Sequence, residues 1–117
     1  MNKMIQKLYV LTLLIFCSIQ PSIMYAQAVA WHTPMGGTSD DIGRCIITDA
    51  AGNVFTTGYF QGTATFGSAA PGNSVSLQAT GSYDIFVTKQ DPTGRLIWAK
   101  KYGGTGDDRG YGIAADA

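Results

Sequence analysis

The chain has 117 residues, enough for one small domain, and it carries eight basic and eight acidic residues. This balance excludes the strongly basic surface that nucleic-acid binding requires. All the acidic residues are aspartates and all 15 glycines follow residue 35, a composition that favours turns over helices. We therefore expect an all-β fold and no nucleic-acid partner.

Residues 1–28 have the features of a secretory signal peptide. Lys3 and Lys7 precede an apolar run at residues 8–19, and an Ala-x-Ala pattern follows at residues 26–28. The run is shorter than the roughly 20 apolar residues that span a bilayer, which favours a cleaved signal over a membrane anchor. Bulky residues before Cys17 disfavour a lipoprotein anchor. We expect cleavage after residue 26 or 28.

The mature segment, residues 29–117, keeps six basic residues against eight aspartates, a net charge of about −2. Cys45 is then the only cysteine, in the apolar stretch "RCIIT", and we expect it to be a buried thiol rather than a reactive one. The signal predicts a secreted or cell-surface protein with no membrane span after cleavage.

Short runs of β-branched and aromatic residues then alternate with Gly, Pro, Asn and Asp. They predict strands at residues 43–48, 54–60, 85–90 and 96–102. Residues 61–83 are rich in Gly, Ser, Ala and Thr and are expected to form a long loop. The predicted architecture is a four-stranded antiparallel meander.

Two Asp-x-x-Gly turns join the strands of this meander in pairs. Asp49 and Asp91 are expected to accept hydrogen bonds from backbone N–H groups two residues on, while Gly52 and Gly94 tolerate positive φ. A calcium site at either aspartate is the alternative, which would require several more oxygen ligands at alternating positions.

The sequence repeats itself at an offset of 67 residues, which aligns Trp31 with Trp98. The glycine pairs Gly36-Gly37 and Gly103-Gly104 coincide, and we expect them to form the crossing between repeat units. Each pair is followed by two aspartates, which we expect to cap the unit by hydrogen bonding, with cation binding as the alternative. The further matches are Thr38, Asp40, Asp41, Gly43, Ile46, Asp49 and Ala50.

Alternation places Phe60 on one face of the second strand and Tyr59 on the other, so both faces of the meander need a cover. Stacked copies of the unit would provide it, as in a β-propeller. We expect one propeller blade and the start of a second, with Trp31 and Trp98 packing between blades. The expected partners are further blades of the same protein or other copies of the chain.

The breaks in the pattern suggest an incomplete propeller. Residues 29–35 correspond to an outermost strand, 96–102, and residues 110–115 to a first strand without a hairpin partner. We therefore expect the chain to be the amino-terminal piece of a longer protein.

These motifs resemble the β-propeller repeat of secreted bacterial proteins called the SBBP repeat. The resemblance covers residues 31–117. It implies a propeller fold and export, and no catalytic residue can be carried over from it. We expect a structural or binding role at the cell surface, with an extracellular protein or glycan as the candidate ligand and with no cofactor or metal. The segments that carry it are Trp98-Ala99-Lys100, Gly103-Gly104-x-x-Asp107-Asp108, Asp49-x-x-Gly52-Asn53-Val54-Phe55 and Asp84-Ile85-Phe86-Val87.

An enzyme is the alternative class. The stretch from Asp91 to Trp98 is similar to the tryptophan-docking motif of quinoprotein propellers, so the chain could belong to a quinoprotein-like or glycan-cleaving propeller enzyme. His32, the only histidine, has no base, nucleophile or ligand partner in its neighbourhood. The stretch "GGTGDDRGYG" lacks the helix of a phosphate loop. The sequence favours a non-enzymatic protein.

Overall fold

The computed structural model describes residues 30–68 and 72–116. The proposed signal peptide lies outside these residues. The described chain contains strands and turns and no helix, which confirms the all-β prediction, and therefore no helix that could cross a membrane. The seven strands are β1 (Met35–Gly37), β2 (Asp41–Thr48), β3 (Val54–Phe60), β4 (Thr63–Gly67), β5 (Ser74–Gln78), β6 (Asp84–Gln90) and β7 (Leu96–Tyr102).

The predicted four-stranded meander is confirmed. Strands β2, β3, β6 and β7 form one antiparallel sheet in that order. Thr56 of β3 lies opposite Ile46 of β2 on one side and Thr88 of β6 on the other. The β2–β3 and β6–β7 ladders each contain an irregularity, between Gly43 and Cys45 and between Lys89 and Gln90.

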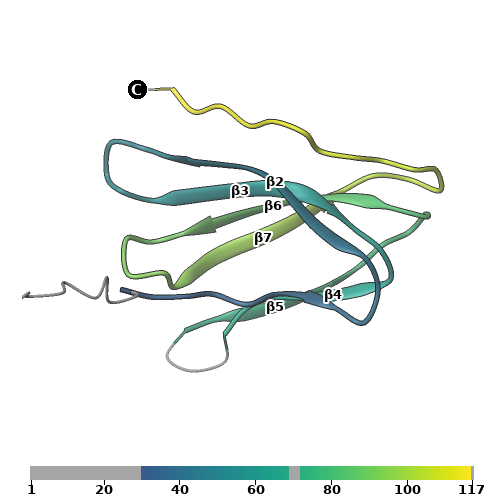
Figure 1. The fold of residues 1–117 in the computed structure, drawn as a ribbon, viewed down its shortest axis with the longest axis horizontal. Coiled ribbons are helices and arrows are strands. Elements are labelled where there is room, and N and C mark those ends of the chain that lie inside the picture. Colours follow the sequence, from purple (N-terminus) through teal and green to yellow (C-terminus); the bar gives the residue numbers. More distant parts are fainter. Residues whose placement is uncertain (1–29, 69–71, 117) are drawn as a thin grey trace, which may run out of the picture.

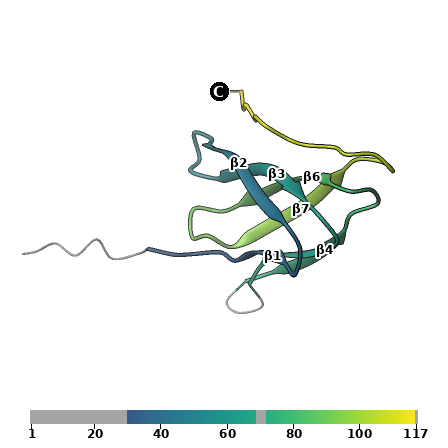
Figure 2. The same ribbon diagram turned by 45° about the vertical axis from the view of Figure 1, so that its right-hand side comes forward.

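The long loop predicted at residues 61–83 is wrong. The structure places β4 and β5 there as a hairpin, and β1 pairs with the other edge of β4. The small-residue composition masked an alternating pattern: Ala64 and Phe66 are buried while Thr63 and Thr65 are exposed, as expected of a strand with one covered face. Figures 1 and 2 show this second sheet packed beneath the first.

The hydrophobic core lies between the two sheets. Its central residues are Phe60, Ala64, Phe66, Phe86 and Leu96, each at most 3% exposed. The Phe66 ring contacts both Phe60 and Phe86, with centroid distances of 5.7 and 4.9 Å. Such aromatic contacts add to the stabilisation from burial alone.

The two faces of the four-stranded sheet are covered differently. The core face carries Phe60 and Phe86 and packs on the second sheet. The opposite face, which we call the open face, carries Phe55, Thr57 and Tyr59 of β3 and their register neighbours. This division matches the alternation predicted for the second strand. The register neighbours are Ile85, Val87 and Lys89 of β6 and Trp98, Lys100 and Tyr102 of β7.

The ends of the described chain differ from the prediction. Residues 110–115 form no strand, because no hairpin partner lies beside them; they run as an extended tail above the open face (Figure 1). A Cβ atom at Gly110 would lie 2.8 Å from both Thr57 Oγ1 and Ile85 Cγ2, so the tail touches β3 and β6. The described part of the expected outermost strand at 29–35 is residues 30–35; among these, only Met35 is in a strand, and that strand pairs with β4.

Candidate functional site

The two copies of the Gly-Gly-x-x-Asp-Asp motif have the same local geometry. Gly36 and Gly103 have φ values of 146° and 150°, a region that favours glycine. The N–H of Gly37 donates to Asp41 Oδ2 at 2.6 Å, and the N–H of Gly104 donates to Asp108 Oδ2 at 2.9 Å. The 67-residue repeat is therefore a structural repeat in this motif.

The first aspartates of the two motifs both lie close to Tyr83. The Tyr83 hydroxyl donates to Asp40 Oδ2 at 3.2 Å, and this hydrogen bond raises the pKa of Tyr83. The N–H of Asp108 donates to the Tyr83 carbonyl, and Asp107 forms an isolated parallel bridge with Tyr83. Within residues 30–68 and 72–116, no group of three or more His, Cys, Asp or Glu side chains could hold a metal ion.

The two Asp-x-x-Gly turns share a hydrogen-bonding pattern. Asp49 Oδ1 accepts from the N–H groups of Ala51 and Asn53, and Asp91 Oδ1 accepts from those of Thr93 and Arg95. Side-chain hydrogen bonds, from Asn53 and from Thr93, are the main cause of the lowered pKa of each aspartate. Gly52 and Gly94 have φ values of 81° and 84°, so each turn has a left-handed residue at its fourth position.

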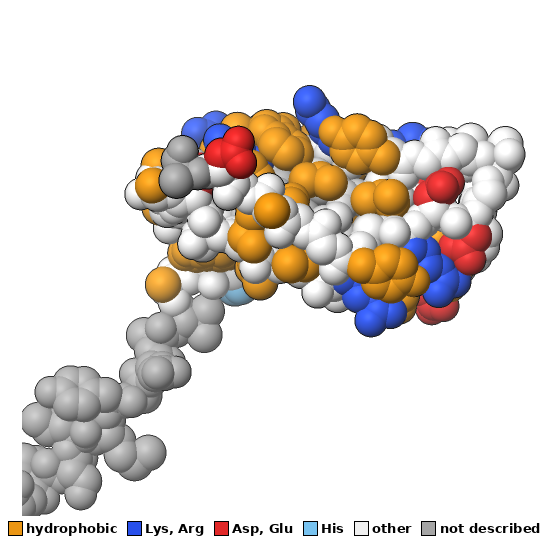
Figure 3. All heavy atoms as spheres, turned by 90° about the horizontal axis from the view of Figure 1, so that it is seen from above, with side chains coloured by type: hydrophobic (Ala, Val, Ile, Leu, Met, Phe, Trp, Pro, Cys, Tyr) orange, Lys and Arg blue, Asp and Glu red, His pale blue; other side chains and the backbone are white. Residues whose placement is uncertain are grey.

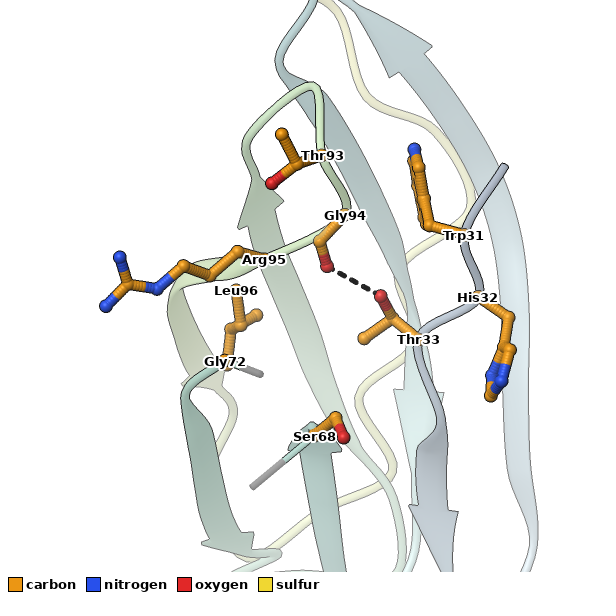
Figure 4. Close-up of a pocket in the computed structure, with 9 residues that line it drawn as sticks. All are labelled: Trp31, His32, Thr33, Ser68, Gly72, Thr93, Gly94, Arg95 and Leu96. Carbon is orange, nitrogen blue, oxygen red and sulfur yellow. Dashed lines mark hydrogen bonds between the residues drawn. The ribbon is translucent and has the colours of Figure 1, made fainter. Parts of the chain in front are cut away.

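Trp31 packs against the second of these turns, on its Gly94 (Figure 4). A Cβ atom at Gly94 would lie only 2.5 Å from Trp31 Cε3, so the ring lies directly on the glycine backbone. The Thr33 hydroxyl donates to the Gly94 carbonyl at 2.7 Å. The contact borders a cavity of about 280 Å³ that Leu96 also lines. His32 points away from Gly94 in Figure 4.

Trp98 occupies the equivalent repeat position but lies on the open face. Its ring meets Phe55 edge-on at a centroid distance of 6.3 Å, and Lys100 Nζ lies 5.4 Å from the Trp98 ring centroid. Lys89, its register partner, lies over the Phe55 ring. Both aromatic rings remain only half-buried, so this end of the open face is an apolar surface with a basic border.

The other end of the open face carries alternating arginine and tyrosine side chains, which the sequence analysis missed. The Arg44 guanidinium lies over the rings of both Tyr59 and Tyr111, 5.2 and 5.6 Å from their centroids. The Arg109 guanidinium lies over the rings of both Tyr59 and Tyr83, at 5.0 and 4.7 Å. Arg44 and Tyr111 occupy equivalent positions of the 67-residue repeat. This correspondence is the feature of the sequence that links the two residues. These contacts attach the tail to the sheet.

A buried ion pair closes the edge of the sheet beside this cluster. Asp84 is fully buried and accepts hydrogen bonds from the N–H groups of Thr80 and Gly81 and from Lys101 Nζ at 2.9 Å. Burial acts to raise the pKa of Asp84, but these hydrogen bonds outweigh it and hold the pKa below its ordinary value. Lys101 of edge strand β7 therefore has an ion-pair partner within the sheet.

Hydrophobic side chains remain exposed around the open face. Figure 3, which views the side of the tail, shows hydrophobic side chains gathered there. Tyr111 of the tail is 63% exposed, and Tyr102 of edge strand β7 is 52% exposed. Cys45 is half-exposed rather than buried, because β2 has only one strand neighbour. A soluble protein typically covers such a surface with another protein segment.

The comparisons with known proteins point to a repeat protein. No protein-family model matches the chain, and no solved structure matches it. The uncharacterized WD repeat-containing protein L264 of Acanthamoeba polyphaga mimivirus is 27% identical over 87 residues. The match covers 74% of this chain and 6% of that protein, so the chain spans a small part of its relative's length. WD repeats are propeller-forming units, and the similarity hints at a propeller-like repeat.

Proposed function

We propose that the chain is a blade-forming unit of an exported β-propeller of the SBBP-repeat type. The observation that carries the proposal is the repeated Gly-Gly-x-x-Asp-Asp motif, which has one geometry at both ends of a single four-stranded unit. The second copy leads the chain onto the open face, where the first strand of a following blade would pack.

The role that this fold supports best is structural or ligand-binding rather than catalytic. Aspartates of the unit serve as turn residues, motif caps and an ion-pair partner. The exposed apolar side chains around the open face fit a protein partner, in the first place further copies of the same unit. An extracellular protein or a glycan is the ligand class we propose for the assembled surface.

A two-repeat chain tests the proposal of a blade. It is made by adding residues 51–117 once more after Ala117, which completes the second unit in register with the 67-residue offset. Repeat units are stabilised by their neighbours, so this chain should unfold in one cooperative transition at a higher denaturant concentration than the single chain. Two independent transitions, one at the single-chain midpoint, would contradict the proposal.

A pair of variants controls for the added length. Ile85→Asp in the first unit places a charge on the open face beside Gly110 and should remove most of the gain. Thr65→Asp, at an exposed position of β4, should leave the gain unchanged.

Export is tested by the mass of the native protein. We propose secretion or surface display, supported by the features of residues 1–28. Intact-mass spectrometry of the extracellular fraction should give a chain that begins at Gln27 or Val29. A product that retains Met1 would contradict export by a cleaved signal.

A further inference from the structure

We propose that Trp98 docks on the glycine of the second Asp-x-x-Gly turn in the repeat unit that follows. The inference rests on the proposed blade function and names the contact that joins one unit to the next. It starts from Trp31, which makes this contact one repeat earlier within the structure, on Gly94.

The Trp31 contact depends on the glycine for two reasons. Gly94 has a φ of 84°, which the turn requires. It also has no side chain, and any Cβ atom there would collide with the indole ring. The turn therefore presents a flat backbone surface, and an indole can cover it while burying a large apolar area.

The repeat offset assigns Trp98 to the same role toward a later unit. Trp31 reaches Gly94 from the segment that precedes the first glycine pair, and Trp98 precedes the second pair at the same spacing. Trp98 lies on the open face, the face that the chain enters at Gly110. The next unit would therefore arrive on the side where Trp98 is half-buried.

The hydrogen bond that Thr33 makes beside Trp31 also has an equivalent position in the second copy of the repeat. The Thr33 hydroxyl donates to the Gly94 carbonyl, and the offset places Lys100 at the position of Thr33. The Lys100 ammonium is a donor of three hydrogens, and it already lies over the Trp98 ring. We assign it the equivalent hydrogen bond to the turn carbonyl of the following unit.

The experiment follows the fluorescence of Trp98 in the two-repeat chain. Trp31→Phe and a Phe at the added copy of position 98 leave Trp98 as the only tryptophan in the mature chain. Docking should shift its emission to shorter wavelength and reduce its quenching by iodide severalfold relative to the single chain with Trp31→Phe. Unchanged emission and quenching would overturn the inference.

Two matched glycine variants of the added unit separate docking from folding. Gly94→Ala in the added unit should restore the emission and quenching of the single chain, because the methyl group occupies the place of the ring. Gly52→Ala imposes the same positive-φ strain, at 81°, but its Cβ would face Pro92, so Trp98 should stay protected. Equal effects of the two variants would overturn the inference.

The outcome is distinguishable from failure of the blade proposal. A two-repeat chain that unfolds cooperatively but leaves Trp98 quenchable would refute the docking contact alone. A two-repeat chain without added stability would refute the blade itself. Protection of Trp98 already present in the single chain at high concentration would assign the surface to self-association instead, and would likewise overturn the inference.

Discussion

The two faces of the four-stranded sheet are built from the same strands and differ in what covers them. On the core face, Phe60 and Phe86 are at most 3% exposed beneath the second sheet. On the open face, the tail covers Thr57 and Tyr59, whereas Phe55, Val87 and Trp98 remain half-buried. The alternation of a strand thus shows that both faces need a cover, but it does not show which segment provides it.

The largest expected effect is the removal of a core-face ring. Phe60→Ala should destabilise the chain by about 3–5 kcal/mol, the range for losing a buried phenylalanine. Phe55→Ala, on the open face, should cost less because its ring is half-exposed. Denaturant unfolding of both variants measures the difference. Equal costs in the single chain would mean that the open face is already covered.

The buried ion pair gives the next effect. Asp84→Asn should cost about 1–3 kcal/mol at neutral pH, since it weakens hydrogen bonds to a charged group. The pKa of Asp84 lies below its ordinary value of 3.8, so its contribution is present above that value and lost as pH falls through the folded-state pKa. Unfolding measured between about pH 6 and pH 2 should therefore show a shallower pH dependence in the variant. If the free energy of unfolding changed with pH equally in the variant and the original chain, the pH dependence could not be assigned to Asp84.

The two motif copies allow a sharper test of the open face. A Cβ atom at Gly37 would collide with the Thr63 carbonyl of β4, whereas one at Gly104 has nothing within 4 Å. Gly37→Ala should therefore cost about 2 kcal/mol or more and Gly104→Ala less than about 0.5 kcal/mol in the single chain. In the two-repeat chain, Gly104→Ala should become as costly as Gly37→Ala, because the added copy of Thr63 would lie beside it. A small cost in both chains would contradict this packing.

The smallest effect concerns Cys45, which is half-exposed on the edge strand. A thiol reagent should label it without denaturant in the single chain, and more slowly in the two-repeat chain, whose added residues contain no cysteine. Quantification by intact mass checks both rates. Labelling that requires denaturant in the single chain would contradict the exposure.

Local patterns predicted the elements that are held by local contacts. The Asp-x-x-Gly turns and the β-branched runs beside them were sufficient for β2, β3, β6 and β7. The β4–β5 hairpin was missed because Thr63, Ala64 and Ser74 are small residues, and its stability comes from Phe66 meeting Phe60 and Phe86 from other strands.

The long-range contacts of the candidate site also could not be predicted from the sequence. Lys101 meets Asp84 because β6 and β7 pair, and Arg44 meets Tyr111 because the tail returns over the sheet. Residues 110–115 show the opposite error: their pattern predicts a strand, but a strand requires a neighbour for its backbone groups.

Hydrogen exchange of the tail tests the central claim most directly. In the single chain, the amide hydrogens of residues 110–115 should exchange rapidly, because these residues have no strand partner. In the two-repeat chain, the added hairpin partner should pair with them on the open face, and their exchange should slow to that of the equivalent residues in β2. Slower exchange of these amide hydrogens in the two-repeat chain would support the claim that the next unit packs on the open face of the blade. Equally rapid exchange in both chains would contradict it.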